Sequence, residues 1–213
     1  GLYNPNLSLP LIPLSDGSGE VVAVGNDVKK FKIGDRVSSV FWQDWNSDVK
    51  TRMISTGSDA AGVLSEYAVL PEAAVLPIPD YLSYQEAATL PCAAVTAWTC
   101  IEAANIKAGD NVLLLGTGGV SIFGLQIAKA LGANVIITSS SDDKLARAVD
   151  LGADATINYK DNPDWGKQAF EAAGVGVNLV IEIGGGGTFN QSMEALTIGG
   201  HISIIGALSG VST

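Results

Sequence analysis

Residues 113–141 read LLLGTGGVSIFGLQIAKALGANVIITSSS, and this stretch decides the fold class. An apolar run leads into a glycine-rich turn, an amphipathic segment follows, and a second apolar run ends in serines. A strand, a glycine turn, a helix and a second strand in this order form the β-α-β unit that binds dinucleotides. In its fingerprint, the first glycine makes the turn, the second admits a pyrophosphate, and the third lets the helix pack on the strand.

The glycine turn fits two of the three fingerprint positions. Gly116 and Gly118 take the first two, whereas Ser121 replaces the third glycine. Serine is small, so the steric departure is modest, and its hydroxyl could donate a hydrogen bond to a phosphate. We expect the pyrophosphate to be held at the helix start by Gly116, Thr117, Gly118, Gly119, Val120 and Ser121. No GxxxxGK[ST] motif occurs, which excludes a phosphate-transfer P-loop.

The end of the second strand selects the nucleotide. An acid about 20 residues after the glycine turn would bind the ribose hydroxyls of NAD. Ser139 stands there instead, 21 residues after Gly118 (139 − 118). Serine hydroxyls and a nearby lysine suit a 2′-phosphate, so the sequence favours NADP over NAD, with Ser139, Ser140, Lys144 and Tyr159 as the expected contacts. Two interpretations stay open, because SSSDDK is also a good helix cap, and Asp142 and Asp143 would weaken a phosphate site that they faced.

From about Ser83 onward, apolar runs alternate with helical patterns. The predicted strands cover 111–116, 134–139, 155–159, 177–183 and 201–206, and the helices between them cover 120–132, 142–152, 164–174 and 188–200. Continuous β-branched runs indicate strands buried on both faces, and the alternation predicts a doubly wound parallel sheet of the α/β class. Before this sheet, Ser83 and Glu86 form a capping-box pattern, and Pro91 should interrupt the helix that they start.

The first part of the chain, up to about Val75, is rich in strands and turns. GEVVAVG (19–25), DRVSSVFW (35–42) and LSEYAVL (64–70) indicate short strands with no helices between them. We therefore place a small β-rich domain at 1–82 and the nucleotide-binding domain at 83–213. The polar segment 44–62 is either a surface loop or, with Trp42 and Trp45, an active-site lid.

Acidic residues outnumber basic ones by 22 to 12, which gives a net charge of −10. This charge argues against a nucleic-acid partner and against binding to an anionic membrane surface. The chain has two cysteines and one histidine, no CxxC motif, and no apolar run long enough to span a bilayer. These features are typical of a reducing cytosol, so we expect a cytoplasmic protein.

Four segments stand out by their order and spacing. They are GEVVAVGNDVKKFKIGDRV (19–37), LSEYAVLPE (64–72), EAATLPCAAVTAW (86–98) and AGDNVLLLGTGGVSIFGLQIAKALGA (108–133). Together they resemble the medium-chain dehydrogenase/reductase superfamily over nearly the whole chain, and most of all its zinc-independent alcohol dehydrogenase-like and quinone oxidoreductase-like branch. The resemblance implies part of a GroES-like catalytic domain, a Rossmann domain, an active site in the cleft between them, and a homodimeric parent protein.

The resemblance also bears on zinc. Zinc-dependent members carry Gly-His-Glu just before the 19–25 strand, where this chain has Leu14, Ser15 and Asp16. Cys92 matches the family's ligand cysteine, but one thiolate without its histidine makes a poor zinc site. The four-cysteine structural zinc lobe is also missing, because only two cysteines occur. We therefore expect no zinc, and we interpret Cys92 as a small apolar residue near the nicotinamide.

The expected activity is hydride transfer between NADP(H) and a carbonyl, an alcohol, or a conjugated enone or quinone. The resemblance places Thr96 beside the nicotinamide, and the ends of the last two strands should wall its pocket with Ile183, Gly184, Gly206, Ala207 and Leu208. Asp16, Trp42 and Cys92 are the candidates to face a small-molecule substrate, and no residue stands out as the general acid.

Three other functions compete with this interpretation. A short-chain dehydrogenase is disfavoured because no tyrosine is followed by a lysine four residues later, and a methyltransferase because Ser139 stands where it would want an acid. A nucleotide-binding module without turnover stays open. The family's opening strands and its sixth Rossmann strand have no counterpart, so we interpret the chain as a fragment in which strand 201–206 is an open sheet edge.

Overall fold

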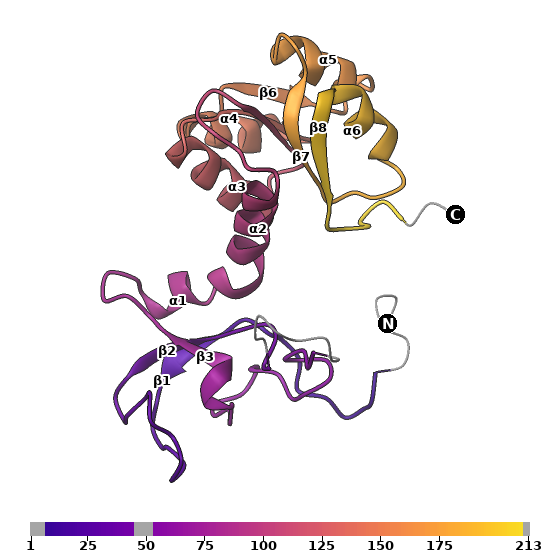
Figure 1. Cartoon of the computed structure of the whole chain (residues 1–213). Helices are drawn as coiled ribbons and strands as arrows, with labels where there is room; N and C mark the ends of the chain where they lie inside the picture. The colour runs from indigo at the N-terminus through magenta and orange to yellow at the C-terminus, as the bar shows by residue number, and fades with distance from the viewer. Residues whose placement is uncertain (1–6, 45–52, 211–213) are drawn as a thin grey trace. The chain divides into compact units, whose positions relative to one another are not determined.

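The computed structural model describes residues 7–44 and 53–210 (Figure 1). The chain divides into two compact units, Gly1–Cys92 and Ala93–Thr213, and each unit has its own sheet. The antiparallel sheet belongs to the first unit and the parallel sheet to the second.

The second unit contains the doubly wound sheet. Its five parallel strands follow the order β6-β5-β4-β7-β8, so the first strand of the unit lies in the middle. The strands are β4 (Asn111–Leu114), β5 (Asn134–Ser139), β6 (Ala155–Asn158), β7 (Val177–Glu182) and β8 (Leu196–Ile204), and the helices between them are α3 (Gly119–Ala130), α4 (Asp142–Asp150), α5 (Trp165–Ala172) and α6 (Phe189–Ala195). The predicted α/β class and strand–helix alternation are confirmed. The strand order reverses between β4 and β7, which is where folds of this kind bind ligands.

Two apolar clusters cover the two faces of this sheet. Val112 and Leu114 of β4 belong to the cluster that contains residues of α2 (Val95–Ala103), α3 and α4. Leu113 and Leu115 belong to the other cluster, with residues of α5 and α6. Successive strand residues point to opposite faces, so a continuous apolar run is buried along its whole length. Each such Val or Leu stabilises the fold by roughly 1.5–3 kcal/mol.

The last strand is longer than the sequence predicted. A helix was expected over 188–200 and a strand over 201–206, but β8 already begins at Leu196, which pairs with Val177. The helix α6 is correspondingly shorter. Among the described strands, β8 pairs with β7 alone, so the expected sheet edge lies at β8.

An ion pair ties α3 to the segment before β6. The Lys129 ammonium lies 2.8 Å from the Asp154 carboxylate, which also accepts the Val135 amide at 2.7 Å. Burial alone would raise the pKa of Asp154, but the hydrogen bonds from Lys129 and Val135 outweigh it and lower that pKa below its usual value. This carboxylate therefore helps to fix the start of β5.

The first unit holds a three-stranded antiparallel sheet. Its strands are β1 (Ser18–Glu20), β2 (Arg36–Ser39) and β3 (Val75–Pro77), with a 3-10 turn, η1 (Glu72–Ala74), before β3. β1 and β2 overlap two predicted strands. The third prediction was wrong, because 64–70 forms no strand: Tyr67 and Val69 are exposed, and no described strand pairs with this segment. The third strand is β3, which pairs with β2.

A helical segment connects the two sheets along the chain. It consists of α1 (Tyr84–Ala87), a π-helical turn η2 (Leu90–Ala94) and α2. The capping box is confirmed, since the Ser83 amide donates to the Glu86 carboxylate at 2.8 Å and the Glu86 amide donates to the Ser83 hydroxyl at 3.2 Å. The α-helix ends at Ala87, and Pro91 lies in the π-helical turn that precedes α2, so the predicted interruption occurs.

The boundary between the two compact units falls within this segment, after Cys92, whereas the sequence placed it at 82–83. The start of the segment packs with the first unit because the Ser18 hydroxyl donates to the Tyr84 carbonyl at 2.6 Å.

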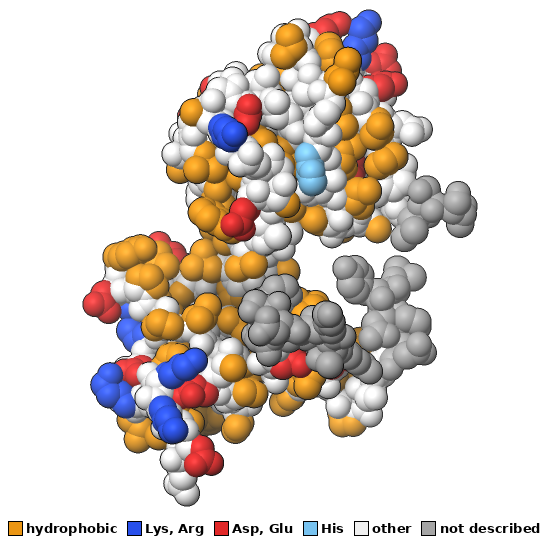
Figure 2. All heavy atoms as spheres, viewed as in Figure 1, with side chains coloured by type: hydrophobic (Ala, Val, Ile, Leu, Met, Phe, Trp, Pro, Cys, Tyr) orange, Lys and Arg blue, Asp and Glu red, His pale blue; other side chains and the backbone are white. Residues whose placement is uncertain are grey.

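Among the described residues, no helix has the length and hydropathy to cross a lipid bilayer. On the face shown in Figure 2, basic side chains lie beside acidic ones and form no broad basic field.

Candidate nucleotide-binding site

The glycine turn follows β4 and begins in the left-handed region of backbone conformation. Gly116 has a φ of +70°, which L side chains rarely adopt, so the turn requires glycine there. Its amide donates to the hydroxyl of Thr138 on β5 at 3.1 Å, and Thr138 is almost fully buried. The sequence analysis missed Thr138, whose only signal is a hydroxyl within an apolar strand.

Gly118 leaves open space at the start of α3. It is the N-cap residue of that helix, its backbone is extended, and no side chain caps the helix. A Cβ built on Gly118 would meet no atom within 4 Å. The amides of the first turn of α3 have no intrahelical acceptor, and the positive end of the helix dipole lies there. Open backbone beside free amides at a helix start fits a pyrophosphate.

Ser121 fills the third fingerprint position, and the role predicted for its hydroxyl was wrong. The residue is fully buried, and the hydroxyl donates to the Leu115 carbonyl at 2.7 Å. A hydroxyl committed inside the fold is not available to a phosphate. Ser121 instead attaches α3 to the residue that follows β4.

Gly124 provides the close helix–strand packing that the third glycine usually gives. A Cβ at this position would lie 3.0 Å from a Leu114 methyl and 3.5 Å from an Ile181 methyl. The helix α3 therefore approaches the sheet closely at this turn. Sequence reasoning missed Gly124, although a glycine inside an apolar helical pattern is a recognised sign of close packing.

The residues expected at the adenosine end lie where β5 and β6 finish. Ser139 is buried, and its hydroxyl lies 3.4 Å from the Thr117 hydroxyl and accepts the Ser141 amide at 3.3 Å. The Tyr159 amide donates to the Ser139 carbonyl at 3.1 Å, so these two strand ends are neighbours, as predicted. Ser140 is half-buried and Tyr159 is exposed, which leaves both accessible to a ligand.

The start of α4 carries the acidic pair and the lysine. Ser141 is its N-cap residue, but the Ser141 side chain makes no capping hydrogen bond. The Asp142 carboxylate accepts a hydrogen bond from the Asn158 amide group at 2.8 Å, which holds this acid at the end of β6. Lys144 is exposed, and its ammonium forms no ion pair within the part of the chain that the structure describes. An uncapped helix start beside an unpaired lysine suits a phosphate.

The loops that follow β7 and β8 lie against each other. The Leu208 amide donates to the Ile183 carbonyl at 3.2 Å. A Cβ on Gly206 would lie only 2.4 Å from the same carbonyl oxygen. The structure therefore gathers all the residues predicted to wall the nicotinamide pocket, which are Ile183, Gly184, Gly206, Ala207 and Leu208. Their contact with a nicotinamide stays a prediction.

Thr96 lies half-buried in the first turn of α2. α2 packs against α3, and a Cβ on Gly119 would lie 3.2 Å from the Ala93 Cβ. The start of α2 is thus a neighbour of the glycine turn. The contact of Thr96 with a nicotinamide stays a prediction.

In the first unit, Asp16 forms hydrogen bonds with Ser15 and Cys92, the two residues that stand at the family's zinc-ligand positions. The Ser15 hydroxyl donates to one Asp16 oxygen, and the Cys92 amide donates to the other at 3.2 Å. The buried Ser39 hydroxyl donates to the Ser15 carbonyl at 2.7 Å. Within the described residues, no group of three His, Cys, Asp or Glu side chains could hold a metal ion. One hydroxyl, one carboxylate and one thiol do not fit a tetrahedral zinc site.

Trp42 is half-buried and packs edge-on against Phe41, with ring centroids 4.8 Å apart. Its backbone forms an isolated bridge with Ser55. These are contacts of a packing residue, and a role for Trp42 in a lid stays a prediction. Trp45 lies outside the described residues.

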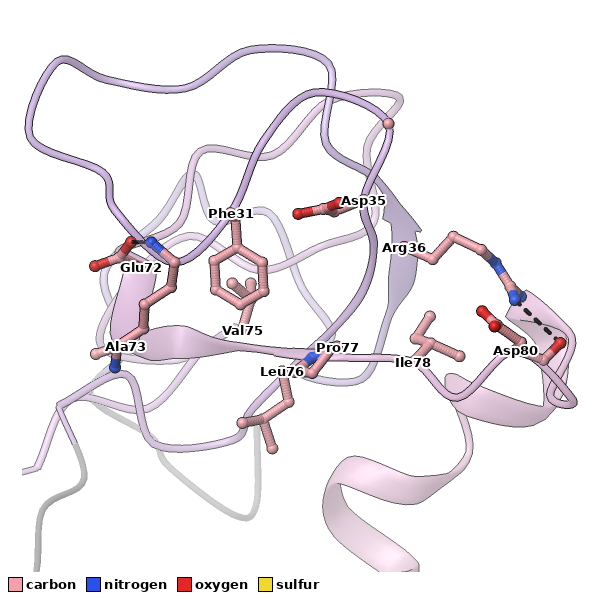
Figure 3. A pocket seen from close by; sticks show the side chains of 12 residues that line it. Phe31, Asp35, Arg36, Glu72, Ala73, Val75, Leu76, Pro77, Ile78 and Asp80 are labelled. Atoms are coloured by element: carbon pink, nitrogen blue, oxygen red, sulfur yellow. Dashed lines mark hydrogen bonds between the residues drawn. The ribbon is translucent and has the colours of Figure 1, made fainter.

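A pocket of about 590 Å³ in the first unit contains none of the predicted site residues. Figure 3 shows Phe31 and Val75 lining it, with Glu72 at one end. Glu72 accepts the backbone amides of Lys30 and Lys29, and these hydrogen bonds lower its pKa. Because this carboxylate serves as a backbone cap, we assign no function to the pocket.

Two family models match the chain. The alcohol dehydrogenase GroES-like domain matches residues 1–80, and the zinc-binding dehydrogenase family matches residues 119–213. A zinc-type alcohol dehydrogenase-like protein of Schizosaccharomyces pombe is 46% identical over 220 residues, which cover 100% of this chain and 64% of the relative. The chain thus spans less than two thirds of the length of that relative.

Solved structures agree with these matches. An NAD-dependent alcohol dehydrogenase has a TM-score of 0.89 at 39% identity, with 98% of this chain and 64% of that chain covered. A quinone oxidoreductase of Pseudomonas syringae pv. Tomato DC3000 has a TM-score of 0.82 at 32% identity, with coverage of 99% and 60%. A mycobacterial protein solved in complex with NADPH has a TM-score of 0.81 at 28% identity, with coverage of 98% and 60%.

The relatives are oxidoreductases of the alcohol dehydrogenase and quinone oxidoreductase types, and they include nicotinamide-dependent proteins. With a GroES-like match at its start, a doubly wound parallel sheet after it, and these relatives along its length, the chain belongs to the medium-chain dehydrogenase/reductase superfamily.

Proposed function

We propose that this chain is the cofactor-binding part of an oxidoreductase that transfers a hydride between NADP(H) and a carbonyl or alcohol, or a conjugated enone or quinone. The observation that carries the proposal is the open space at Gly118, at the uncapped start of α3. A pyrophosphate needs close approach to backbone there, and a helix start supplies amide donors and a positive dipole end.

The choice of NADP over NAD is supported by the residues at the ends of β5 and β6. No acid stands at the end of β5, where NAD binders place one. Lys144 is free of ion pairs in the described residues, and Ser140 and Tyr159 are accessible. Asn158 holds Asp142 at β6, which weakens the objection that this acid would repel a phosphate. Family membership alone does not select the nucleotide, because relatives of both kinds occur.

We propose further that catalysis proceeds without zinc, although the matching family is described as zinc-binding. The support comes from the side chains that could bind a metal ion at this place. The hydroxyl of Ser15 and both oxygens of Asp16 are engaged in hydrogen bonds with each other and with the Cys92 backbone. A catalytic zinc takes three ligands from Cys, His and carboxylate groups, and this arrangement offers no histidine.

The chain's own residues would bind and orient the cofactor, and the bound cofactor would supply the hydride chemistry. The glycine turn would fix the pyrophosphate, while the loops after β7 and β8 would limit where the nicotinamide ring lies. A Cβ on Gly116 would lie 3.8 Å from an Ile183 methyl, so these two parts of the site are neighbours.

The low basic content supports the proposal that neither nucleic acid nor an anionic membrane is a partner. The cytoplasmic location and the homodimeric parent are likewise proposals.

The test is a substrate screen on the full-length parent protein. NADPH oxidation is followed with an aldehyde, an enone and a quinone, each with and without a zinc chelator. We expect turnover of at least one substrate class, unchanged by the chelator. Loss of activity with the chelator would refute zinc independence, and NADPH binding without any turnover would favour a non-catalytic module.

A further inference from the structure

Glu182 is the last residue of β7, and its side chain is fully buried. It is the acid in the otherwise largely apolar run VNLVIEI (177–183), and the sequence analysis gave it no role. Burying a carboxylate is costly unless it is well hydrogen-bonded, so an acid at such a position calls for a physical reason.

Four donors surround this carboxylate. One oxygen, Oε1, accepts the amides of Gly184 at 2.6 Å and Gly185 at 3.0 Å, and the Thr188 hydroxyl at 2.6 Å. The other oxygen accepts the Ser192 hydroxyl. No Lys or Arg forms an ion pair with Glu182 in the described part of the chain. The four donors are all neutral groups, and three of them lie in the segment 184–188.

The backbone of this segment is closely packed and lies partly in the left-handed region. A Cβ on Gly184 would lie 2.2 Å from the Thr188 hydroxyl oxygen, and Gly185 has a φ of +85°. The amides of both glycines donate to the same carboxylate oxygen, so Glu182 holds the segment in this conformation. A loop of four successive glycines has high conformational freedom when nothing holds it.

The same segment is attached to the loop after β8. The Ser209 hydroxyl donates to the Gly184 carbonyl at 2.7 Å and accepts the Gly187 amide at 3.1 Å. The Gly186 amide donates to the Gly210 carbonyl at 2.9 Å. A change at Glu182 would therefore loosen both loops that are predicted to wall the nicotinamide pocket.

We propose that Glu182 is a positioning residue of the cofactor site. Its buried carboxylate fixes the loop 183–188, and through it the loop 205–210, in the shape that receives the nicotinamide end of the cofactor. This inference rests on the proposed function. It predicts an effect on the nicotinamide end alone, because the glycine turn and the adenosine end make no hydrogen bond to Glu182.

The test compares Glu182→Gln with the native chain in two measurements. Amide hydrogen exchange over 183–188 should become at least tenfold faster in the variant, without a comparable change at β4 or β5. Affinity for NADPH should fall at least fivefold, whereas affinity for 2′,5′-ADP, which lacks the nicotinamide end, should stay within twofold.

A matched control comes from the first unit. Glu72 also caps two successive backbone amides with one carboxylate oxygen, so Glu72→Gln makes the same chemical change far along the chain from the cofactor residues. It should leave NADPH affinity unchanged. If Glu182→Gln fails to fold, Thr188→Val removes one donor and keeps the charge, and it should show the same pattern with a smaller effect, about twofold.

Unchanged exchange over 183–188, or an equal loss of affinity for both ligands, would overturn the role of Glu182. A native chain that binds 2′,5′-ADP but not NADPH would also contradict it. A native chain that binds neither ligand refutes the proposed function, and the inference with it.

Discussion

Replacing Gly118 with alanine should separate cofactor binding from stability. The φ of Gly118 is −78°, which any residue adopts, and an added Cβ meets no protein atom within 4 Å. The expected loss of stability is that of a poorer N-cap, at most about 1 kcal/mol. The methyl group would, however, occupy the space that the pyrophosphate needs. We expect NADPH affinity to fall at least tenfold, which is about 1.4 kcal/mol.

The assay pairs thermal unfolding with a nicotinamide fluorescence titration, and two further alanine variants calibrate it. Gly116→Ala places a side chain at φ +70° and should cost about 1–2 kcal/mol of stability in addition to cofactor affinity. Gly174→Ala also places one at positive φ, +77°, with no atom within 4 Å, but it lies after α5 and outside the predicted site. It should lose similar stability and keep normal affinity.

Native NADPH affinity in Gly118→Ala would rule out a pyrophosphate at Gly118, because a pyrophosphate that tolerates a methyl group there does not approach this backbone. A loss of affinity in Gly174→Ala equal to that in Gly116→Ala would show that instability alone explains both.

Three other substitutions have defined outcomes. Lys144→Ala should weaken NADPH binding roughly tenfold and leave NADH binding unchanged, as fluorescence titration would show, since the lysine would contact only the 2′-phosphate. Thr138→Val should leave the Gly116 amide without its acceptor and cost about 1–3 kcal/mol in denaturant unfolding, and a loss below about 0.5 kcal/mol would contradict this. Asp154→Asn should make the free energy of unfolding depend less on pH in the acid range. The folded pKa of Asp154 is depressed, so its contribution is present above the usual Asp pKa and is lost as pH falls through the folded pKa; an unchanged acid profile would count against it.

Most of the second unit could be predicted because its signals are local. Apolar runs such as NVLLLG and NVIITS are long enough to mark strands buried on both faces, and glycine, serine and aspartate mark the turns between them. The 64–70 segment shows the limit. LSEYAVL has strand composition, yet a strand exists only where another strand pairs with it, and sequence alone does not reveal the partner.

The strand ends and turns that carry the candidate site residues could be predicted, whereas the hydrogen bonds of their side chains could not. The sequence places Ser121 at the third fingerprint position, but whether its hydroxyl faces a phosphate or the Leu115 carbonyl depends on how deeply α3 packs. Glu182 and Thr138 were missed for a related reason. Each is a polar residue near the end of a largely apolar strand, and its importance shows only when the backbone amides of a distant or following loop are found against it.

The decisive measurement is a titration of the purified chain with NADPH and NADH side by side. If the second unit binds NADP through the glycine turn and the ends of β5 and β6, NADPH will bind saturably and at least tenfold more tightly than NADH. Equal affinities or a preference for NADH would contradict the assignment of Ser139, Ser140 and Lys144 to a 2′-phosphate. Binding of neither nucleotide would contradict the site itself.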